Sequence, residues 1–276
     1  MKEKRKNKKK GRFSTIREHI KRDKVAFSVY VILRLLVIVS LVLSVFRGNY
    51  ENAGLCVATL LLLLAPAIIE RKMNIDLPTA LEVVVMCFIF AHTILGEMAC
   101  FYVKVPGWDT MLHTTNGFIC AGVGFSLIDL LNRNKKFKFE LSPVYVSLVA
   151  FCFSMTVGIL WEFFEFGMDF FAHTDMQKDT VINSISSVML DPTSQNKPIR
   201  IDNIKDVIVN GNPLGLGGYL DIGLIDTMKD LFVNFIGAVV FSFGGFFYIK
   251  YRGKKSTKLV QGFIPVPNEE NKEKQA

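Results

Sequence analysis

Residues 25–46 read VAFSVYVILRLLVIVSLVLSVF, and this stretch decides the class of protein. A helix needs about 20 consecutive apolar residues to cross the hydrocarbon core of a bilayer. The stretch meets that length with one charged residue, Arg34. A signal peptide has a shorter apolar region, and the residues that follow here, SVFRGNYENA, offer no good small-residue cleavage site. We therefore interpret residues 25–46 as an uncleaved membrane span.

Five further apolar stretches follow the first. They are Leu55–Ile69, Leu77–Tyr102, Trp108–Leu131, Pro143–Ala172 and Leu224–Lys250. Half of the 276 residues are hydrophobic (50%), which is high for a soluble protein of this length. The sequence predicts an all-α, polytopic integral membrane protein with six transmembrane helices in contact with a lipid bilayer.

The distribution of basic residues predicts the orientation of the spans. Of 33 Lys and Arg residues, 12 lie in the first 24 positions, directly before the first span. This position favours binding to anionic lipids and argues against a nucleic-acid partner. If the N-terminus is cytoplasmic, 25 of the 33 lie on the cytoplasmic side and 6 on the other. The positive-inside rule thus predicts that both termini are cytoplasmic.

This topology divides the chain into three parts. Residues 1–24 form a basic cytoplasmic tail, residues 25–250 form the six-helix transmembrane domain, and residues 251–276 form a disordered cytoplasmic tail. One sizeable extracytoplasmic segment remains, at about residues 173–223. Within it, the alternating sequence IRIDNIKDVIVNG predicts a short hairpin.

Ionisable residues gather at the outer ends of the last three spans. WDTMLH and IDTMKD, at residues 108–113 and 225–230, begin two spans with the same pattern. A carboxylate at the bilayer centre costs about 2.5–3.5 kcal/mol, so such groups should face one another or a wet cavity. The candidate site residues are Asp109, His113, Glu162, Glu165, Asp169, Asp226 and Asp230.

Two interpretations of these residues remain open. All except Asp169 are candidate ligands of a divalent cation such as Mg²⁺, Mn²⁺ or Zn²⁺, because carboxylates and one imidazole suit such ions. Alternatively, Asp109 and Asp226 only cap the helices that they begin. Capping does not account for Glu165 and Asp169 near a helix C-terminus, where negative charge is unfavourable.

The same motifs resemble a known family. WDTMLHTTNGF, WEFFEFGMDFFAHTDMQKDT and DTMKDLFVNFIGA are similar to signature segments of the YjdF family of bacterial inner-membrane proteins, and their layout is similar to that of VanZ-like proteins. The resemblance covers spans three to six and implies a multi-pass protein of the bacterial plasma membrane. It carries over Asp109, His113, Gly117, Trp161, Glu162, Glu165, Asp169, Asp175, Gln177, Asp226, Asp230 and Gly237. The long connection between TDMQKDT and GLIDTM departs from the family pattern.

The family resemblance implies no activity, so three functional hypotheses remain. The first is an enzyme whose cation acts on a lipid-linked envelope precursor at the outer leaflet. The second is a small ion-coupled transporter, and the third is a non-catalytic protein that binds lipid-linked envelope components. The sequence leaves the choice between enzyme and non-enzyme open, as well as the identity of the metal and the oligomeric state.

The predicted topology can be tested by cysteine labelling. In a background without the five native cysteines, a membrane-impermeant maleimide applied to intact cells should label Gln195→Cys and leave Lys135→Cys unlabelled. Labelling of Lys135→Cys after permeabilisation is the control. The opposite pattern would invert the topology and move the candidate site to the cytoplasmic side.

Overall fold

The computed structural model describes most of the chain. The described residues are 24–73, 75–133, 141–251, 263–264 and 266–267. Apart from Lys24, the predicted basic tail lies outside them. The chain separates into two compact units, the first formed by Met1–Met155 with Asn234–Ala276 and the second by Thr156–Val233. Helices α8 (Pro143–Ala172) and α9 (Leu224–Lys250) each run without a break from one unit into the other.

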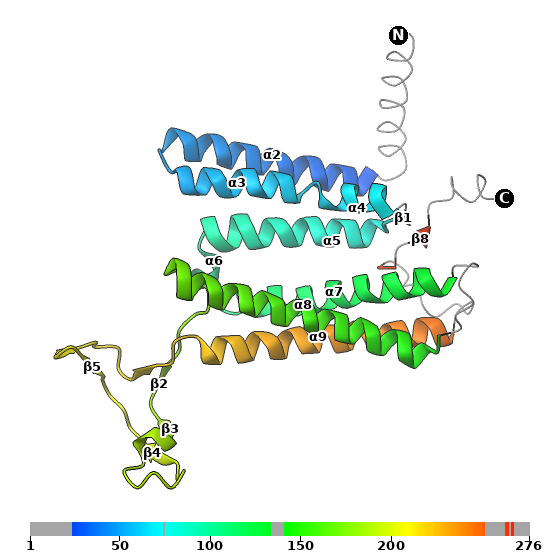
Figure 1. The fold of residues 1–276 in the computed structure, drawn as a ribbon. Helices are drawn as coiled ribbons and strands as arrows, with labels where there is room; N and C mark the ends of the chain where they lie inside the picture. The colour runs from blue at the N-terminus through cyan, green and yellow to red at the C-terminus, as the bar shows by residue number, and fades with distance from the viewer. Residues whose placement is uncertain (1–23, 74, 134–140, 252–262, 265, 268–276) are drawn as a thin grey trace, which may run out of the picture. The chain divides into compact units, whose positions relative to one another are not determined.

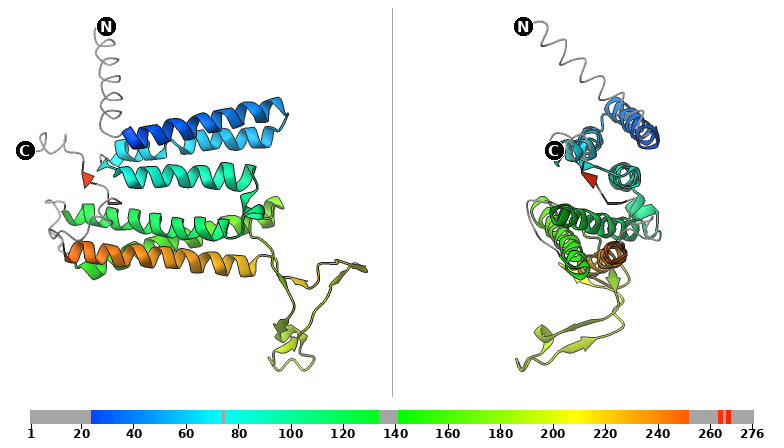
Figure 2. Two further views of the ribbon diagram at one scale, coloured as in Figure 1. Left: turned by 180° about the vertical axis from the view of Figure 1, so that it is seen from behind. Right: turned by 90° about the vertical axis from the view of Figure 1, so that its right-hand side faces the viewer.

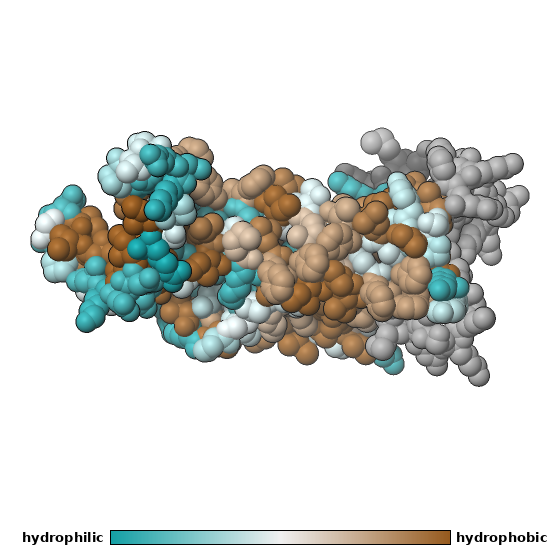
Figure 3. Space-filling model, turned by 90° about the horizontal axis from the view of Figure 1, so that it is seen from below, coloured by the Kyte–Doolittle hydropathy of each residue, from teal (hydrophilic) through white to brown (hydrophobic). Residues whose placement is uncertain are grey.

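The prediction of six membrane spans is confirmed. Six helical stretches are long and apolar enough to cross a membrane: Lys24–Phe46, Tyr50–Lys72, Thr79–Met98, Trp108–Asp129, Pro143–Ala172 and Leu224–Lys250. Large hydrophobic side chains remain exposed along them, for example Leu61, Leu148 and Phe243. Hydrophobic residues cover much of the helical surface in Figure 3. Such a surface is what a helix presents to lipid.

Two of the spans are less regular than predicted. The second consists of α3 (Tyr50–Leu62) and α4 (Ala65–Met73), and it extends beyond the predicted Leu55–Ile69 at both ends. Pro66, which lacks a backbone N–H, lies in the first turn of α4, where that loss is tolerated. The Asn49 side chain caps α3 by accepting a hydrogen bond from the Asn52 N–H at 3.0 Å.

The third span was predicted as one helix over Leu77–Tyr102, and its last part is different. It consists of α5 (Thr79–Phe90), a π-helix η1 (Ala91–Met98) and a short helix α6 (Phe101–Lys104). Cys100, with φ of 58°, turns the chain between η1 and α6. The Tyr102 ring lies so close to Gly96 that an added Cβ would be 2.9 Å from its Cζ. This contact holds α6 against η1.

The first unit contains two hydrophobic clusters. In the first, α2 (Lys24–Phe46) packs against α3 and α5, as Figures 1 and 2 show, and buries Val37, Cys56 and Met86. The second cluster joins α7 (Trp108–Arg133) to the parts of α8 and α9 in this unit, around Phe125 and Phe241. Their rings meet edge to face, with centroids 5.9 Å apart.

A short part of the predicted disordered tail is ordered. Ile264 is 2% exposed in the second cluster, and the Phe263 ring packs edge to face on Phe118. Strand β8 (Val266–Pro267) pairs antiparallel with β1 (Ile75–Asp76). The rest of residues 252–276 lies outside the described residues.

The second unit contains the loop between α8 and α9, which is built from short antiparallel pairs. Strand β2 (Val181–Ile182) pairs with β7 (Tyr219–Leu220), and β5 (Ile208–Val209) pairs with β6 (Asn212–Pro213). Strand β3 (Ile185–Ser187), which precedes the 3₁₀ turn η2 (Val188–Leu190), pairs with β4 (Ile199–Ile201). The predicted hairpin within IRIDNIKDVIVNG is therefore wrong, because its two ends pair with strands outside it.

Glycines bring α7 and α9 into backbone contact within the first unit. A Cβ on Gly117 would collide with the Asn234 carbonyl group, whose carbon would lie 2.9 Å away. A Cβ on Gly237 would meet the Thr114 carbonyl oxygen and lie 2.8 Å from the Phe118 nitrogen. Small residues allow this close approach between membrane helices. The contact fixes the register of the two helices.

Replacing Gly117 with Ala should disrupt this contact. The new Cβ would meet rigid backbone, so we expect the melting temperature in detergent to fall by several degrees, equivalent to about 1–3 kcal/mol. Gly54→Ala is the matched control, because nothing lies within 4 Å of its added Cβ. Equal melting temperatures for the two variants would contradict the α7–α9 packing.

Candidate functional site

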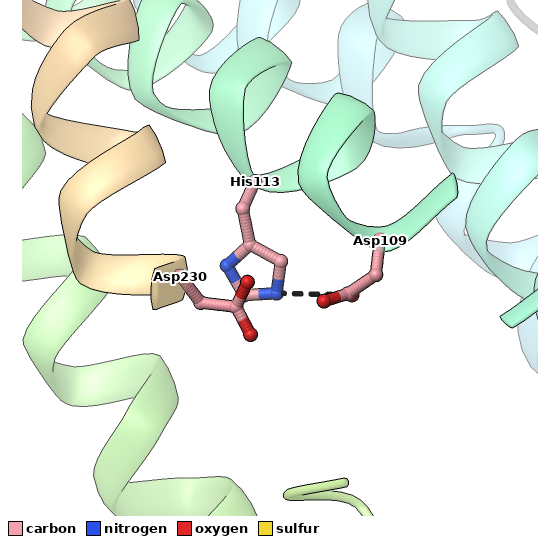
Figure 4. A group of neighbouring side chains, drawn as sticks. All are labelled: Asp109, His113 and Asp230. Carbon is pink, nitrogen blue, oxygen red and sulfur yellow. Dashed lines mark ion pairs between the residues drawn. The ribbon is translucent and has the colours of Figure 1, made fainter. Parts of the chain in front are cut away.

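The first turns of α7 carry a partly buried His–Asp pair in the first unit. Asp109 and His113 are one turn apart, and Asp109 Oδ1 lies 3.4 Å from His113 Nε2. The side chains are 23% and 12% exposed. Figure 4 marks this ion pair with a dashed line. Asp109 therefore has a side-chain partner in addition to its position at the start of the helix.

Two polar atoms at the start of α7 are buried without a hydrogen-bond partner in the described part of the chain. They are Asp109 Oδ2 and the indole nitrogen of Trp108. The Trp108 ring packs edge to face on Phe101, with centroids 4.9 Å apart. Buried polar groups normally have partners. This turn thus offers one acceptor and one donor to a ligand or to water.

His92 belongs to the same neighbourhood, which the sequence did not indicate. It lies close enough to His113 and Asp109 for their charges to interact. Its Nδ1 shares a hydrogen bond with the Tyr102 hydroxyl, and its ring stacks on Phe88. The π-helix and the bend at Cys100 create this arrangement, and no sequence spacing predicts either of them.

Two glutamates of α8 are buried in the second unit. Glu162 is 4% exposed and Glu165 is 7% exposed. The Trp161 indole N–H donates a hydrogen bond to Glu165 Oε1 at 2.8 Å. The predicted i,i+3 spacing therefore places both carboxylates away from lipid, in agreement with the cost of exposing a charge there.

Asp169 and Asp226, by contrast, fasten the loop of the second unit to its helices. Asp169 accepts hydrogen bonds from the Thr174 hydroxyl and from the backbone N–H groups of Met176 and Gln177, at 2.6–2.8 Å. Asp226 Oδ2 accepts the Lys178 N–H at 2.8 Å. That Asp226 is a metal ligand stays a prediction, and its described contacts are to Lys178 and Lys229.

Asp221 caps the start of α9. Its carboxylate accepts the N–H groups of Ile225 and Thr180, at 2.8 and 2.7 Å. Burial raises the pKa of Asp221, but the backbone hydrogen bonds outweigh it and hold the pKa below its usual value. The stabilisation is therefore present above the unfolded pKa and is lost as the pH falls through the folded pKa.

The other predicted residues differ in burial and in their contacts. Asp230 of α9 is 1% exposed in the second unit. Asp175 lies 3.3 Å from Lys178 and is 66% exposed, and Gln177 Nε2 donates to the Thr227 hydroxyl. Gly117 and Gly237 serve the helix contact described above. Asn234, which is 1% exposed in the first unit, was not among the predicted site residues.

Removing the Asp169 carboxylate should loosen the loop. Asp169→Ala removes three hydrogen bonds that this carboxylate accepts, and two of them come from backbone N–H groups. We expect local opening to become easier by about 1–3 kcal/mol and limited proteolysis within residues 173–182 to accelerate about tenfold or more. Asp175→Ala, which removes an exposed ion pair in the same segment, is the control. Equal cleavage rates for both variants would contradict the role of Asp169 in holding the loop.

The comparisons with known proteins identify the family and no activity. An uncharacterised protein of Thermotoga maritima is 26% identical over 105 residues, which cover 38% of this chain and 52% of that protein. The match thus spans about half the length of that relative. No solved structure matches the chain. The model of the predicted membrane protein family DUF2238 matches residues 29–251. The chain therefore belongs to the DUF2238 family of predicted membrane proteins, and the resemblance to the YjdF family is confirmed.

Proposed function

We propose that the protein binds a divalent cation through Asp109 and His113 of α7, in the bacterial plasma membrane and with the 173–223 loop on the extracytoplasmic side. The observation that carries the proposal is the partly buried Asp109–His113 pair, in which Asp109 Oδ2 is buried and has no hydrogen-bond partner among the described residues. A buried carboxylate oxygen of this kind needs a partner. A bound cation would supply it.

The spacing of the two residues supports this role. Asp109 and His113 lie one turn apart on α7, and residues four apart on a helix can bind a single metal ion from one face. The pair offers one carboxylate and one imidazole. The other predicted ligands, Glu162, Glu165, Asp226 and Asp230, belong to the second unit, and their part in metal binding stays a prediction.

The ligand chemistry favours a hard or borderline cation. Carboxylate oxygens suit Mg²⁺ and Mn²⁺. The imidazole adds affinity for Mn²⁺ and Zn²⁺ over Mg²⁺. Glu162 and Glu165 have no assigned ligand role in this proposal. Both are buried carboxylates of α8 in the second unit.

The cation would act on, or help to bind, the phosphate of a lipid-linked envelope component. The buried Trp108 indole N–H supports this role, because it offers a hydrogen bond to an oxyanion next to the Asp109 ligand. A metal ion there would polarise a phosphoryl oxygen. Whether bond cleavage follows distinguishes an enzyme from a binding protein, and both use the same cation site.

One observation favours ion transport as a second candidate function. Asp129 lies near the other end of α7 and is 1% exposed. Ionisable residues inside membrane domains often mark ion pathways. A transporter would move cations in sealed proteoliposomes and would lose this flux in Asp129→Asn, whereas a phosphate-binding protein or an enzyme would show no flux.

A purified sample should be stabilised by the cation. We expect Mn²⁺ to raise the melting temperature in detergent, because a ligand at about 100 times its Kd stabilises the folded state by about 2.7 kcal/mol. Asp109→Asn and His113→Ala should lose this shift. Asp226→Asn is the matched control on α9, because its described contacts are to Lys178 and Lys229.

The control shows whether loss of the Mn²⁺ shift is specific to the proposed ligands. Asp226→Asn should keep the Mn²⁺ shift even where its melting temperature without metal is lower. Absence of a shift for the wild type with Mn²⁺, Zn²⁺ and Mg²⁺, or an unchanged shift in both Asp109→Asn and His113→Ala, would overturn the proposed function.

A further inference from the structure

A segment of the C-terminal tail packs inside the first unit. Phe263 and Ile264 belong to the second hydrophobic cluster, and strand β8 follows them; we call residues 263–264 and β8 the tail segment. Ile264 is 2% exposed, and the Phe263 ring meets Phe118 edge to face, with centroids 5.2 Å apart. Phe118 lies well inside α7, so the tail segment contacts the body of this helix and not its end.

The tail segment also reaches the part of the unit that holds the first cluster. Strand β8 pairs antiparallel with β1, with Ile75 opposite Pro267 and Asp76 opposite Val266. Strand β1 precedes α5, which packs with α2 and α3 in the first cluster. Figure 1 shows β8 next to β1. The tail segment therefore links the two clusters, because its first residues pack in one and its last residues pair with the strand that leads into the other.

This link lies at one particular end of the third span. The helices themselves also connect the clusters, because α5 and η1 pack against α7. η1 follows α5, whereas β1 precedes it, so the pairing with β8 lies at the start of the span. The predicted topology places that end on the cytoplasmic side. The tail segment thus adds a connection at the cytoplasmic end of the helices.

The link should be easier to break than the contacts between helices. β1 and β8 have two residues each, and so short a ladder is not stable without packing. Phe263 and Ile264 supply that packing from the second cluster. A segment anchored by two side chains and a short ladder can open locally while the helices stay folded.

We propose that the tail segment is a reversible latch that closes the second cluster at the cytoplasmic end of the helices. In the closed state, Ile264 is buried with Phe125 and Tyr248, and β8 holds the segment to β1. In the open state, the segment leaves both partners, and water reaches the second cluster while the first cluster stays packed. The latch operates whether or not a cation binds at Asp109.

The test measures how fast a maleimide labels one buried thiol in each cluster, because a thiol reacts only when water and reagent reach it. Ala121→Cys reports on the second cluster and the native Cys56 on the first, and both positions are 0% exposed. Each full-length variant keeps a single cysteine. Ile264→Ala should accelerate the labelling of Ala121→Cys about tenfold or more and leave Cys56 unchanged. Ile32→Ala is the matched control, the same truncation at a side chain that is 56% exposed on α2.

Two results would contradict the latch. Equal acceleration at both thiols would mean that Ile264→Ala destabilises the whole unit, and unchanged labelling at both would mean that the segment does not close the cluster. If Ala121→Cys does not fold, Ala150→Cys replaces it, because this position is also 0% exposed in the second cluster.

A disulfide provides a second test, which decides if Ile264→Ala does not fold. Cysteines at the paired positions Ile75 and Pro267 should form a cross-link, because directly opposed residues of an antiparallel pair lie within the Cα distance that a disulfide spans. The cross-link ties the tail segment to β1 and should slow the labelling of Ala121→Cys. No cross-link, or an unchanged labelling rate once it has formed, would overturn the proposal.

Discussion

The contact between α7 and α9 depends on one constraint. The backbones of two helices can touch only where no Cβ lies between them. Gly117 and Gly237 provide it from opposite sides, each against a carbonyl group of the other helix. In a bilayer, close packing replaces the hydrophobic driving force that joins helices in water. The register fixed here determines which residues of α7 lie level with which residues of α9 in the first unit.

The acidic residues near the loop have different physical roles, although they look alike in sequence. Asp169, Asp221 and Asp226 accept backbone N–H groups and hold the loop to the ends of α8 and α9. Asp109 has a histidine as its partner and one carboxylate oxygen without a hydrogen bond among the described residues. The described hydrogen bonds therefore distinguish the carboxylates that hold the loop from Asp109.

Buried amide and indole groups add information that charge alone does not give. Asn234, which is 1% exposed, was not among the predicted site residues. Its Nδ2 donates towards α8, to the Ser154 carbonyl oxygen at 3.5 Å. His92 lies on a π-helix, in which one extra residue per turn changes the face that a side chain occupies.

The sequence by itself determined the class of protein, the six spans and the family, because apolar runs of membrane length and a fairly specific set of motifs are local properties of the chain. It also indicated where ionisable residues gather, through the two D-T-M segments. Only the tertiary structure decided which carboxylates bind the loop, that Asp221 accepts a backbone N–H at the start of α9, and that the third span ends in a π-helix and a turn. These features depend on hydrogen bonds and packing between residues as much as 50 positions apart, such as Gln177 and Thr227, and no local pattern records such contacts.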